Sequence, residues 1–383
     1  MKKKKVVLLR SNPVSPDPPV EKTADFLLSE GYDVTILAWD RSTDKPVEED
    51  LITLAHGQAK VYRAFYKGQF SGGIKKNLKS LIRFQKFLYT WLKRNKENYD
   101  IIHAYDFDTA LVASLIAKKY KKKIVYAILD YYVASHNLSG STIGNVIKKL
   151  EDKTIGEADV TLICTEKRKE QIKGATPKHL EIIHNTPIEP KLCDIVERVC
   201  KSDSNRMKIV YVGIFGEGRL LRELSHAVKN RADCELHIGG FGAGMEAYFE
   251  ELSHTTDNIF YYGKLKYQDT LQLERECDVM TAIYDPVVPN HQFAAPNKFY
   301  ESLMLGKPII MVENTGFDDI IRNEHIGELI HYNEGSLNSA ISELLNKRNE
   351  WNSMSTNAKR LYKDFYSWEI MQGRLKKVYA LFD

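Results

Sequence analysis

Residues 296–310 contain a cation and a carboxylate at a spacing that could bind a phosphorylated sugar. The segment predicts a helix followed by a buried strand at 309–312. It begins with Pro-Asn, has a glycine at 306 that is typical of a helix C-terminal cap, and continues with Pro308 ahead of an apolar run. Lys298 and Glu301 are three residues apart and share one face of this helix. With the helix N-terminus they could bind a phosphate and the ribose diol beside it. The alternative is an ordinary helix–turn–strand unit.

Apolar runs typical of buried strands alternate with helical patterns along the whole chain. Such alternation favours parallel, doubly wound sheets, which bind ligands at the carboxyl ends of their strands. We therefore expect an α/β protein with two Rossmann-like doubly wound domains facing across a cleft. The strands are predicted at 6–9, 34–39, 101–103, 124–128, 160–164, 180–183, 208–213, 234–238, 259–261, 278–283 and 309–312. The helices are predicted at 20–30, 74–94, 110–119, 142–158, 220–230, 245–254, 267–277, 336–346, 350–364 and 368–382.

The length of 383 residues is typical of two domains. Prolines and charged residues predict a linker at 188–206, between an N-terminal domain at 1–187 and a C-terminal domain at 207–364. The apolar run after the first lysines is too short for a signal peptide, and no stretch is long enough to cross a membrane. The cysteines show neither a Cys-x-x-Cys pair nor metal-type Cys/His spacing, so we expect reduced thiols in a cytoplasmic protein. They are Cys164, Cys193, Cys200, Cys234 and Cys277.

Basic residues gather in the first half of the chain. Residues 51–150 contain 18 lysines and arginines against five acidic residues. The predicted helix at 74–94 is either a surface helix with a solvated basic face or, with Trp91, an element that contacts anionic lipid headgroups. Nucleic acid is not expected, because no recognition motif accompanies the charge. The apolar positions at helical spacing are Ile74, Leu78, Leu81, Leu88 and Leu92, and the basic face comprises Lys75, Lys79, Arg83 and Lys86.

Several motifs occur in a characteristic order. The first half contains Asp-Pro-Pro-Val-Glu-Lys at 17–22, Gly-Tyr-Asp-Val-Thr-Ile-Leu-Ala-Trp-Asp at 31–40, Asp-Ile-Ile-His-Ala-Tyr-Asp at 100–106 and Glu-Ala-Asp-Val at 157–160. The second half contains Val-Gly at 212–213, Leu-His-Ile-Gly-Gly-Phe-Gly at 236–242, Tyr-Gly-Lys at 262–264 and the 296–310 segment. Over its whole length the chain resembles the family 4-type retaining glycosyltransferases of the GT-B fold. In that family, Phe-Tyr-Ser-Trp at 365–368 would begin a C-terminal helix, here 365–383, that returns to the N-terminal domain.

The resemblance implies that the C-terminal domain binds a nucleotide-sugar donor. Glu301 matches the glutamate that accepts hydrogen bonds from both ribose hydroxyls. Arg219 matches a cation that binds the diphosphate, and Lys298 is a second candidate for this role. Glycines after strands would let backbone N–H groups approach the diphosphate, although tight packing also explains them. The expected donor-binding residues are Gly213, Arg219, Gly240, Gly242, Gly263, Lys264, Asn297, Lys298 and Glu301.

In the N-terminal domain, His103, Asp106 and Asp130 follow strands and are expected to face the cleft and bind sugar or acceptor hydroxyls. A buried histidine with its hydrogen bonds satisfied is the alternative for His103. Asp106 and Asp108 also form the Asp-x-Asp motif that binds metal in the other glycosyltransferase fold, but no metal is expected where protein cations bind the diphosphate. The expected catalytic residues are His103, Asp106, Asp130, Arg219 and Lys298.

Three positions depart from the family pattern. Phe293 stands where an acidic residue usually lies eight residues before the ribose glutamate, so the sugar specificity is left open. Tyr105 replaces a frequent second histidine, and Pro19 stands where an Asp-Pro-Arg motif has its arginine.

The resemblance implies a retaining transfer from a nucleoside-diphosphate sugar, preferably a UDP-sugar, to a glycan or lipid-linked acceptor in the assembly of bacterial surface polysaccharides or glycoconjugates. Arg219, Lys298 and the helix N-terminus would stabilise the leaving diphosphate without a cofactor or metal. The alternatives are a nucleotide-sugar epimerase of the same fold and a non-catalytic binding or stabilising subunit. The expected location is the cytoplasm, peripheral to the inner face of the membrane through residues 74–94.

Overall fold

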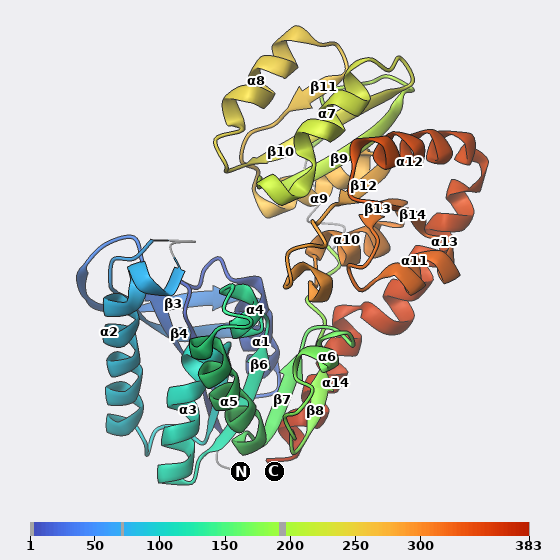
Figure 1. The fold of residues 1–383 in the computed structure, drawn as a ribbon. Helices are drawn as coiled ribbons and strands as arrows, with labels where there is room; N and C mark the ends of the chain where they lie inside the picture. Colours follow the sequence, from blue (N-terminus) through green and yellow to red (C-terminus); the bar gives the residue numbers. More distant parts are fainter. Residues whose placement is uncertain (1–3, 70–72, 191–196, 383) are drawn as a thin grey trace. The chain divides into compact units, whose positions relative to one another are not determined.

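The chain folds into two compact units, Met1–His184 with Gln372–Asp383 (unit 1) and Asn185–Met371 (unit 2). The computed structural model describes residues 4–69, 73–190 and 197–382. Each unit has one sheet with helices on both faces (Figure 1). The predicted linker at 188–206 includes residues 191–196, and therefore Cys193, which lie outside the described residues.

The sheet of unit 1 has eight strands in the order β3-β4-β2-β1-β5-β6-β7-β8. β1 pairs in parallel with β2 and β5, and its apolar run is buried, as expected for a parallel strand covered on both faces. Only the edge pair β3–β4 is antiparallel. The strands are β1 (Lys5–Arg10), β2 (Asp33–Asp40), β3 (Lys45–Leu54), β4 (Gly57–Phe65), β5 (Ile101–Tyr105), β6 (Lys123–Ile128), β7 (Val160–Ile163) and β8 (Leu180–Ile182).

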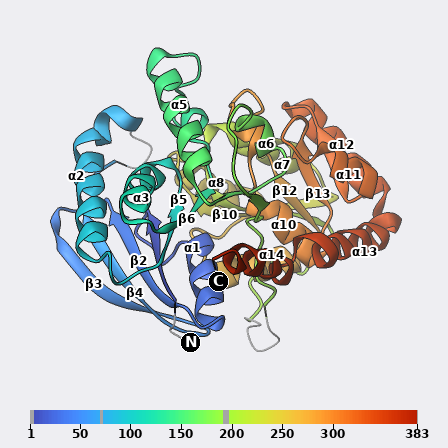
Figure 2. The same ribbon diagram turned by 90° about the horizontal axis from the view of Figure 1, so that it is seen from below.

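The helices of unit 1 divide between the two faces of this sheet. Figure 2 shows α2 and α3 on one face and α1 on the other. The apolar cluster beneath α2, α3 and α5 includes Val7 and Leu9, whereas the alternate residues Val6 and Leu8 are buried toward the opposite face. The helices are α1 (Pro18–Ser29), α2 (Gly73–Arg94), α3 (Phe107–Tyr120), α4 (Tyr132–Ser135), α5 (Thr142–Glu157), α6 (Arg168–Gln171) and the end of α14 (Trp368–Ala380).

The buried side of α2 differs from the predicted one. Leu88 and Leu92 are buried as expected, but Leu78 is 49% exposed. Trp91 is half-buried and packs against Tyr62 and Tyr99, at ring distances of 5.4 and 6.5 Å, so it contributes little to the exposed face of the helix. The side chains of Ile74 and Lys75 lie outside the described part of the structure.

The sheet of unit 2 is wholly parallel, in the order β11-β10-β9-β12-β13-β14. Ile209 and Tyr211 of β9 contribute to the core beneath α7, α8 and α12, whereas Val210 and Val212 contribute to the core beneath α9, α10 and α13. The strands are β9 (Met207–Ile214), β10 (Cys234–Phe241), β11 (Ile259–Tyr261), β12 (Val279–Ala282), β13 (Ile309–Val312) and β14 (Gly327–Ile330). The helices are α7 (Leu221–Lys229), α8 (Glu246–Thr255), α9 (Tyr267–Glu276), α10 (Asn297–Leu305), α11 (Asp318–Glu324), α12 (Glu334–Asn346) and α13 (Trp351–Leu361).

The predicted class, an α/β protein with two doubly wound sheets, is confirmed. The helix at 297–305, its left-handed cap at Gly306 (φ 67°) and the strand at 309–312 occur where the sequence predicted them. A π-helical turn over Tyr362–Tyr366 ends the predicted helix at 350–364 early. No helix in the described ranges combines the length and hydropathy that a membrane span requires.

Candidate functional site

Two cations of unit 2 lie over aromatic rings near the carboxyl end of β9. The ammonium of Lys298 lies 4.7 Å from the centroid of the Tyr211 ring, and the guanidinium of Arg219 lies 3.7 Å from that of Tyr284. Both cations also act electrostatically on the Tyr211 hydroxyl, so they belong to one cluster. The structure thus brings together the two residues that the sequence nominated for phosphate binding.

Gly213 leaves the space that Lys298 occupies. A Cβ atom at this position, which has φ 155°, would lie 2.7 Å from the Lys298 Nζ atom. Burial alone would lower the pKa of the Lys298 ammonium, but its neighbours, led by Tyr284 and Tyr211, raise it above the usual value. Lys298 therefore remains a full positive charge in this setting.

Arg219 presents a hydrogen-bond donor that the protein itself does not use. It ends a short 3-10 turn, Glu217–Arg219, and its Nη1 atom is buried with no partner among the described residues. A buried, unpaired donor costs free energy of about 1–3 kcal/mol, more for a charged group. An anionic ligand at Nη1 would remove that cost.

The N-terminus of α10 begins beside these cations. Pro296 occupies the N-cap position and offers no capping side chain, and no acidic residue lies in the first turn. The first backbone N–H groups and the positive end of the helix dipole are therefore uncompensated by side chains. The side-chain amide oxygen (Oδ1) of Asn297 accepts a 2.6 Å hydrogen bond from Nδ2 of Asn185, so this side chain is already engaged within unit 2.

Glu301 lies one turn further along α10 and is 3% exposed. A second carboxylate, Glu274 of α9, is 1% exposed and has one oxygen without a partner among the described residues. Burial, and then the nearby charge of Glu301, raise the pKa of Glu274 well above its usual range. This favours a protonated Glu274. The Tyr267 hydroxyl interacts with Glu301 as well.

The glycines at 240 and 242 serve the packing of the loops. A Cβ atom at Gly240 would lie 1.9 Å from the Gly213 carbonyl oxygen, and one at Gly242 would lie 3.0 Å from that of Phe215. The N–H of Gly240 donates to the Gly263 carbonyl, and that of Gly242 donates to the Glu246 carboxylate. Because both N–H groups are already bonded, close packing accounts for these two glycines, and their assignment as diphosphate donors is not supported.

The remaining predicted donor residues lie at the end of the neighbouring strands. Gly263 adopts a left-handed conformation (φ 65°) after β11, and the exposed Lys264 lies 4.9 Å from the ring of Phe241. A pocket of about 280 Å³ opens at the same edge of the sheet, between the turn that precedes α7 and the loop after β10. Its lining includes Gly216, Leu221 and Ala243 but not Arg219, Lys298 or Glu301.

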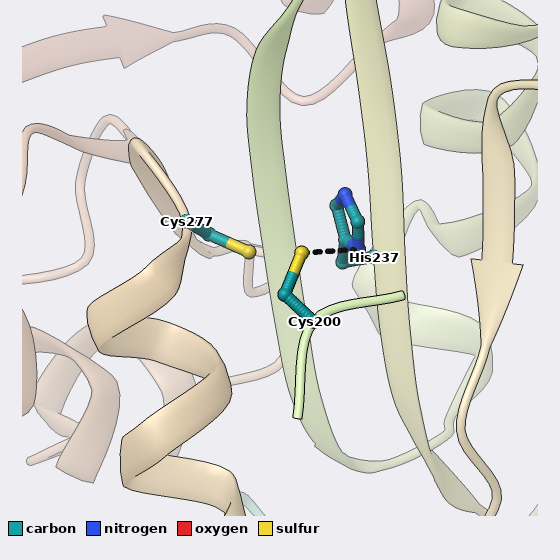
Figure 3. Close-up of side chains that lie close together, drawn as sticks. All are labelled: Cys200, His237 and Cys277. Carbon is teal, nitrogen blue, oxygen red and sulfur yellow. Dashed lines mark hydrogen bonds between the residues drawn. The ribbon is translucent and has the colours of Figure 1, made fainter. Parts of the chain in front are cut away.

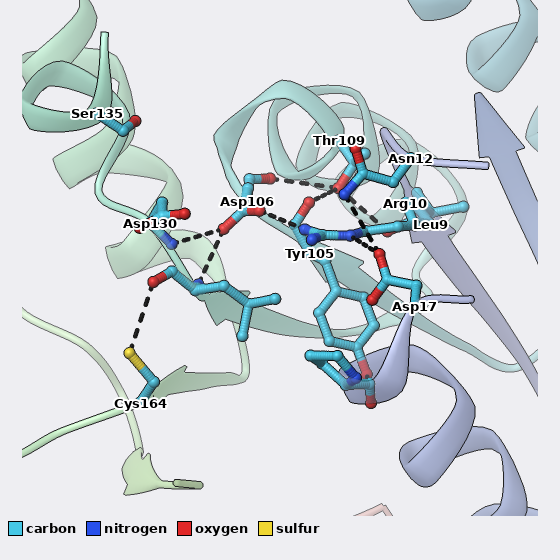
Figure 4. Close-up of polar contacts among 12 residues, drawn as sticks. Leu9, Arg10, Asn12, Asp17, Tyr105, Asp106, Thr109, Asp130, Ser135 and Cys164 are labelled. Carbon is cyan, nitrogen blue, oxygen red and sulfur yellow. Dashed lines mark hydrogen bonds and ion pairs between the residues drawn. The ribbon is translucent and has the colours of Figure 1, made fainter. Parts of the chain in front are cut away.

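In unit 1, Asp106 belongs to a closed polar network rather than an open site (Figure 4). One carboxylate oxygen accepts from Arg10, which also donates a 2.7 Å hydrogen bond to Asp17. The other oxygen accepts from the backbone N–H groups of Leu129 and Asp130 at 2.9 and 3.0 Å. Burial raises the pKa of Asp106 to about 6 although Arg10 opposes this shift. Its carboxylate joins β1, β5 and the β6–α4 loop, so the structure supports a positioning role in place of the predicted contact with sugar hydroxyls.

His103 lies within β5, not after it, and is 1% exposed. Its Nδ1 atom is 2.8 Å from the hydroxyl of Tyr379 in α14, and its ring stacks on Tyr105 at 4.6 Å. Burial lowers the pKa of His103 to about 3. The ring is buried, as in the alternative left open by the sequence, but only its Nδ1 atom is hydrogen-bonded; the buried Nε2 atom has no partner among the described residues.

Asp130 is the predicted acceptor-side residue with an exposed carboxylate. Its side chain is 57% exposed and one oxygen lies 3.3 Å from the guanidinium of Arg168, which is buried. Arg168 also donates to the Cys164 sulfur at 2.8 Å. Asp130 is thus held at the carboxyl end of β6 by an arginine that cannot itself reach solvent.

Sequence reasoning missed Tyr211, Tyr284 and Glu274. Tyr211 lies within β9 and Tyr284 lies just after β12, two strands that end at the site. An aromatic residue at such a position could have indicated a partner for a cation. Glu274 gave none, because a glutamate in a polar helical segment is ordinarily exposed.

Two family models match this chain. Residues 20–186 match the model described as Glycosyltransferase Family 4, and residues 206–347 match the model described as Glycosyl transferases group 1. Together they cover more than half of the chain. The chain belongs to the group 1, family 4-type glycosyltransferases. No curated protein matches this glycosyltransferase at a significant level.

Solved structures of the GT-B type resemble the glycosyltransferase over nearly its whole length. Sucrose-phosphate synthase from Thermosynechococcus elongatus is 14% identical, with 99% of each chain covered and a TM-score of 0.76. Anabaena HepE in complex with UDP-glucose is 13% identical, with 98% of this chain and 99% of that chain covered and a TM-score of 0.67. A putative UDP-N-acetylglucosamine 2-epimerase from Listeria monocytogenes is 14% identical, with 97% and 95% covered and a TM-score of 0.62. These similarities confirm the predicted GT-B fold.

Proposed function

We propose that this glycosyltransferase moves a sugar, with retention of configuration, from a nucleoside diphosphate to the hydroxyl of a glycan or lipid-linked acceptor, in the assembly of bacterial surface polysaccharides or glycoconjugates. The observation that carries the proposal is the buried Nη1 atom of Arg219, which has no partner among the described residues and lies in one cluster with Lys298. Neither Arg219 nor Lys298 forms an ion pair among the described residues, so both positive charges could bind the two phosphates of a diphosphate.

The two halves of the donor are assigned to opposite parts of α10. Its N-terminus and Lys298 would contact the phosphates, and Glu301, one turn later, would accept hydrogen bonds from the ribose hydroxyls. A UDP-sugar is the favoured donor, because HepE was crystallised with UDP-glucose. A protonated Glu274 beside Glu301 limits the negative charge near the phosphates.

The proposed reaction breaks the bond between the anomeric carbon and the diphosphate oxygen. The acceptor oxygen bonds to that carbon on the same face, and its proton passes to the departing phosphate oxygen. Arg219 and Lys298 stabilise the charge on the departing diphosphate, so no divalent metal is required. We assign no protein nucleophile.

The outward face of α2 supports an acceptor at a membrane. We define the docking face as Leu78, Ile82 and Tyr89 with Lys79, Lys86 and Lys93, all of which are exposed. These residues fall on one side of the helix, opposite the buried Phe84, Leu88 and Leu92, and α2 contains no acidic residue. An apolar strip flanked by lysines is what binding to anionic headgroups requires, so we place the enzyme in the cytoplasm, peripheral to the membrane.

A donor screen followed by a turnover assay tests the proposed function. A nucleotide at about 100 times its dissociation constant adds roughly 2.7 kcal/mol to the free energy of unfolding, which a thermal shift detects. We expect UDP and a UDP-sugar to stabilise the protein more than GDP or ADP derivatives, and the α-linked donor to give an α-linked product by NMR. Conversion of the donor to its epimer without an acceptor would identify an epimerase, and stabilisation without turnover on membrane-extracted acceptors would identify a binding subunit.

A further inference from the structure

Two cysteines and a histidine that are distant in sequence come together in the interior of unit 2. They are Cys200, in the segment before β9, His237 of β10, and Cys277, at the end of α9 (Figure 3). The two sulfur atoms and a ring nitrogen all lie within 4.8 Å of one another, and all three residues are buried. The proposed sugar transfer uses none of them.

The distances approach those of a tetrahedral metal site. The Cys200 Sγ atom lies 3.8 Å from the His237 Nδ1 atom. Zinc–sulfur and zinc–nitrogen bonds of about 2.3 and 2.0 Å place neighbouring ligand atoms about 3.6–3.8 Å apart in a tetrahedron. The cluster needs only a small contraction to reach this geometry.

The remaining contacts of His237 orient its ring as metal-bound histidines are oriented. Its Nε2 atom lies 3.3 Å from a carboxylate oxygen of Glu235, which is buried. A carboxylate that accepts from one ring nitrogen leaves the other free to coordinate a metal. The Tyr262 hydroxyl lies 2.7 Å from Nδ1 and is hydrogen-bonded to it, so a metal at Nδ1 would replace this hydrogen bond.

We propose that Cys200, His237 and Cys277 bind one thiophilic divalent cation, with Zn²⁺ as the expected ion. Thiolate and imidazole ligands favour zinc over magnesium or calcium, which take oxygen ligands. The site is distinct from the Arg219–Lys298 cluster, and the proposal does not depend on the proposed transfer reaction.

The cation would fasten one segment of chain to the body of unit 2. The backbone N–H groups of Val199 and Cys200 already donate to Glu276 at 3.0 and 2.6 Å, and that of Lys201 donates to Tyr262 at 3.0 Å. A metal at Cys200 would add a bond from this segment to both β10 and the α9–β12 junction. Its role is therefore structural, and it should raise the thermal stability of the protein.

Cobalt is the probe for this site, because tetrahedral Co²⁺ bound by thiolates has an intense visible and near-ultraviolet absorbance. The full-length protein, reduced and stripped of metal, is titrated with Co²⁺ and then with Zn²⁺. We expect one equivalent of Co²⁺ to bind, Zn²⁺ to displace it, and the melting temperature to rise. Cys200→Ser and Cys277→Ser should each lower the affinity by at least a hundredfold, and Glu235→Gln by about 10–100-fold with the stoichiometry kept.

Cys234→Ala is the matched control, since Cys234 is a buried cysteine of the same unit outside the cluster. It should bind Co²⁺ as the wild type does. Equal cobalt spectra from the wild type and the folded Cys200→Ser/Cys277→Ser double variant would overturn the proposal. Absence of the thiolate absorbance in the reduced, folded wild type would also overturn it. A Cys200–Cys277 disulfide that forms in the purified protein, together with that absence, would identify the pair as redox-active thiols instead.

Discussion

The guanidinium carbon of Arg219 lies over the Tyr284 ring, 3.7 Å from its centroid. The ring holds the cation in position without neutralising it, since an aromatic face attracts a cation through its quadrupole and carries no charge. Tyr284 thus orients a cation whose Nη1 atom remains available for a ligand.

Two substitutions of Tyr284 should distinguish the contribution of its ring to UDP binding from that of its hydroxyl. Tyr284→Leu is expected to weaken UDP binding by about 3–30-fold, because a cation–π contact of about 0.5–2 kcal/mol is lost. Tyr284→Phe keeps the ring and should bind within twofold of the wild type. Calorimetry with UDP measures both, and equal losses in the two variants would assign the effect to the hydroxyl instead.

Glu301 can be tested with a modified nucleotide. Glu301→Gln should weaken UDP binding roughly tenfold or more, because hydrogen bonds to a charged group contribute about 1.5–3 kcal/mol. The wild type should bind UDP more tightly than 2′-deoxy-UDP, and the variant should lose this preference. Glu274→Gln is the matched control: it imitates the protonated acid and should keep both the affinity and the preference. A preference that survives in Glu301→Gln would remove the ribose assignment.

Sugar transfer should continue after divalent metal ions are removed by a chelator. If Arg219 and Lys298 neutralise the diphosphate, excess EDTA leaves the initial rate within about twofold of the untreated enzyme at a temperature where the protein stays folded. Asp106 supports this expectation, because both of its carboxylate oxygens already accept hydrogen bonds. Loss restored by Mg²⁺ or Mn²⁺ would contradict it. A lowered melting temperature restored only by Zn²⁺ belongs to the Cys200–His237–Cys277 site.

Glu151 makes the stability of unit 1 depend on pH. It is buried, accepts a 2.8 Å hydrogen bond from Tyr126, and burial raises its pKa from 4.5 to about 8. The folded state therefore binds a proton more tightly than the unfolded state. This stabilising contribution is complete below about pH 4.5 and is lost as the pH rises through 8.

Glu151→Gln should flatten this profile. Between pH 5 and 8.5 the melting temperature of the wild type should fall relative to that of the variant, by an amount that corresponds to about 1.4 kcal/mol per unit of pKa difference as an upper limit. Differential scanning calorimetry at several pH values measures this difference. Parallel profiles for the two proteins would show that Glu151 is charged in the folded state.

The docking face predicts a salt-dependent association with anionic vesicles. Lys79→Gln/Lys86→Gln/Lys93→Gln should abolish sedimentation with phosphatidylglycerol vesicles at low salt, and wild-type binding should weaken at high salt because exposed charges are screened beyond about 8 Å at physiological ionic strength. Lys118→Gln/Lys119→Gln on α3 is the control. If the wild type fails to bind at either salt concentration and transfers to a soluble acceptor, α2 is an ordinary surface helix.

Most strands and helices followed from sequence because their burial is regular. Runs such as Val6–Leu9 are apolar throughout, as parallel strands covered on both faces must be. The β3–β4 hairpin was missed because β3, with seven consecutive exposed residues, shows no buried pattern. It is stabilised by pairing at the sheet edge, which depends on a partner strand and not on its own composition.

The candidate site was only partly predictable. Lys298 and Glu301 could be paired from their spacing within one helix, which is local information. The contact of Arg219 with Tyr284, and the cluster of Cys200, His237 and Cys277, join residues far apart in sequence and exist only once the sheet is formed. The hydrogen bonds of Asp106 and His103 were not predictable, because position after a strand does not reveal whether a side chain is already bonded.

The completion of unit 1 by the end of α14 has a consequence for the order of folding during synthesis. Tyr379 bonds to His103, and the Lys4 ammonium donates to the Phe382 carbonyl, so both contacts await residues that leave the ribosome after all of unit 2. Until then the face of the β1–β5 strand pair that α14 covers remains open to solvent or to a chaperone. A nascent chain of this enzyme should therefore expose apolar surface in its first-made half for longer than in its second.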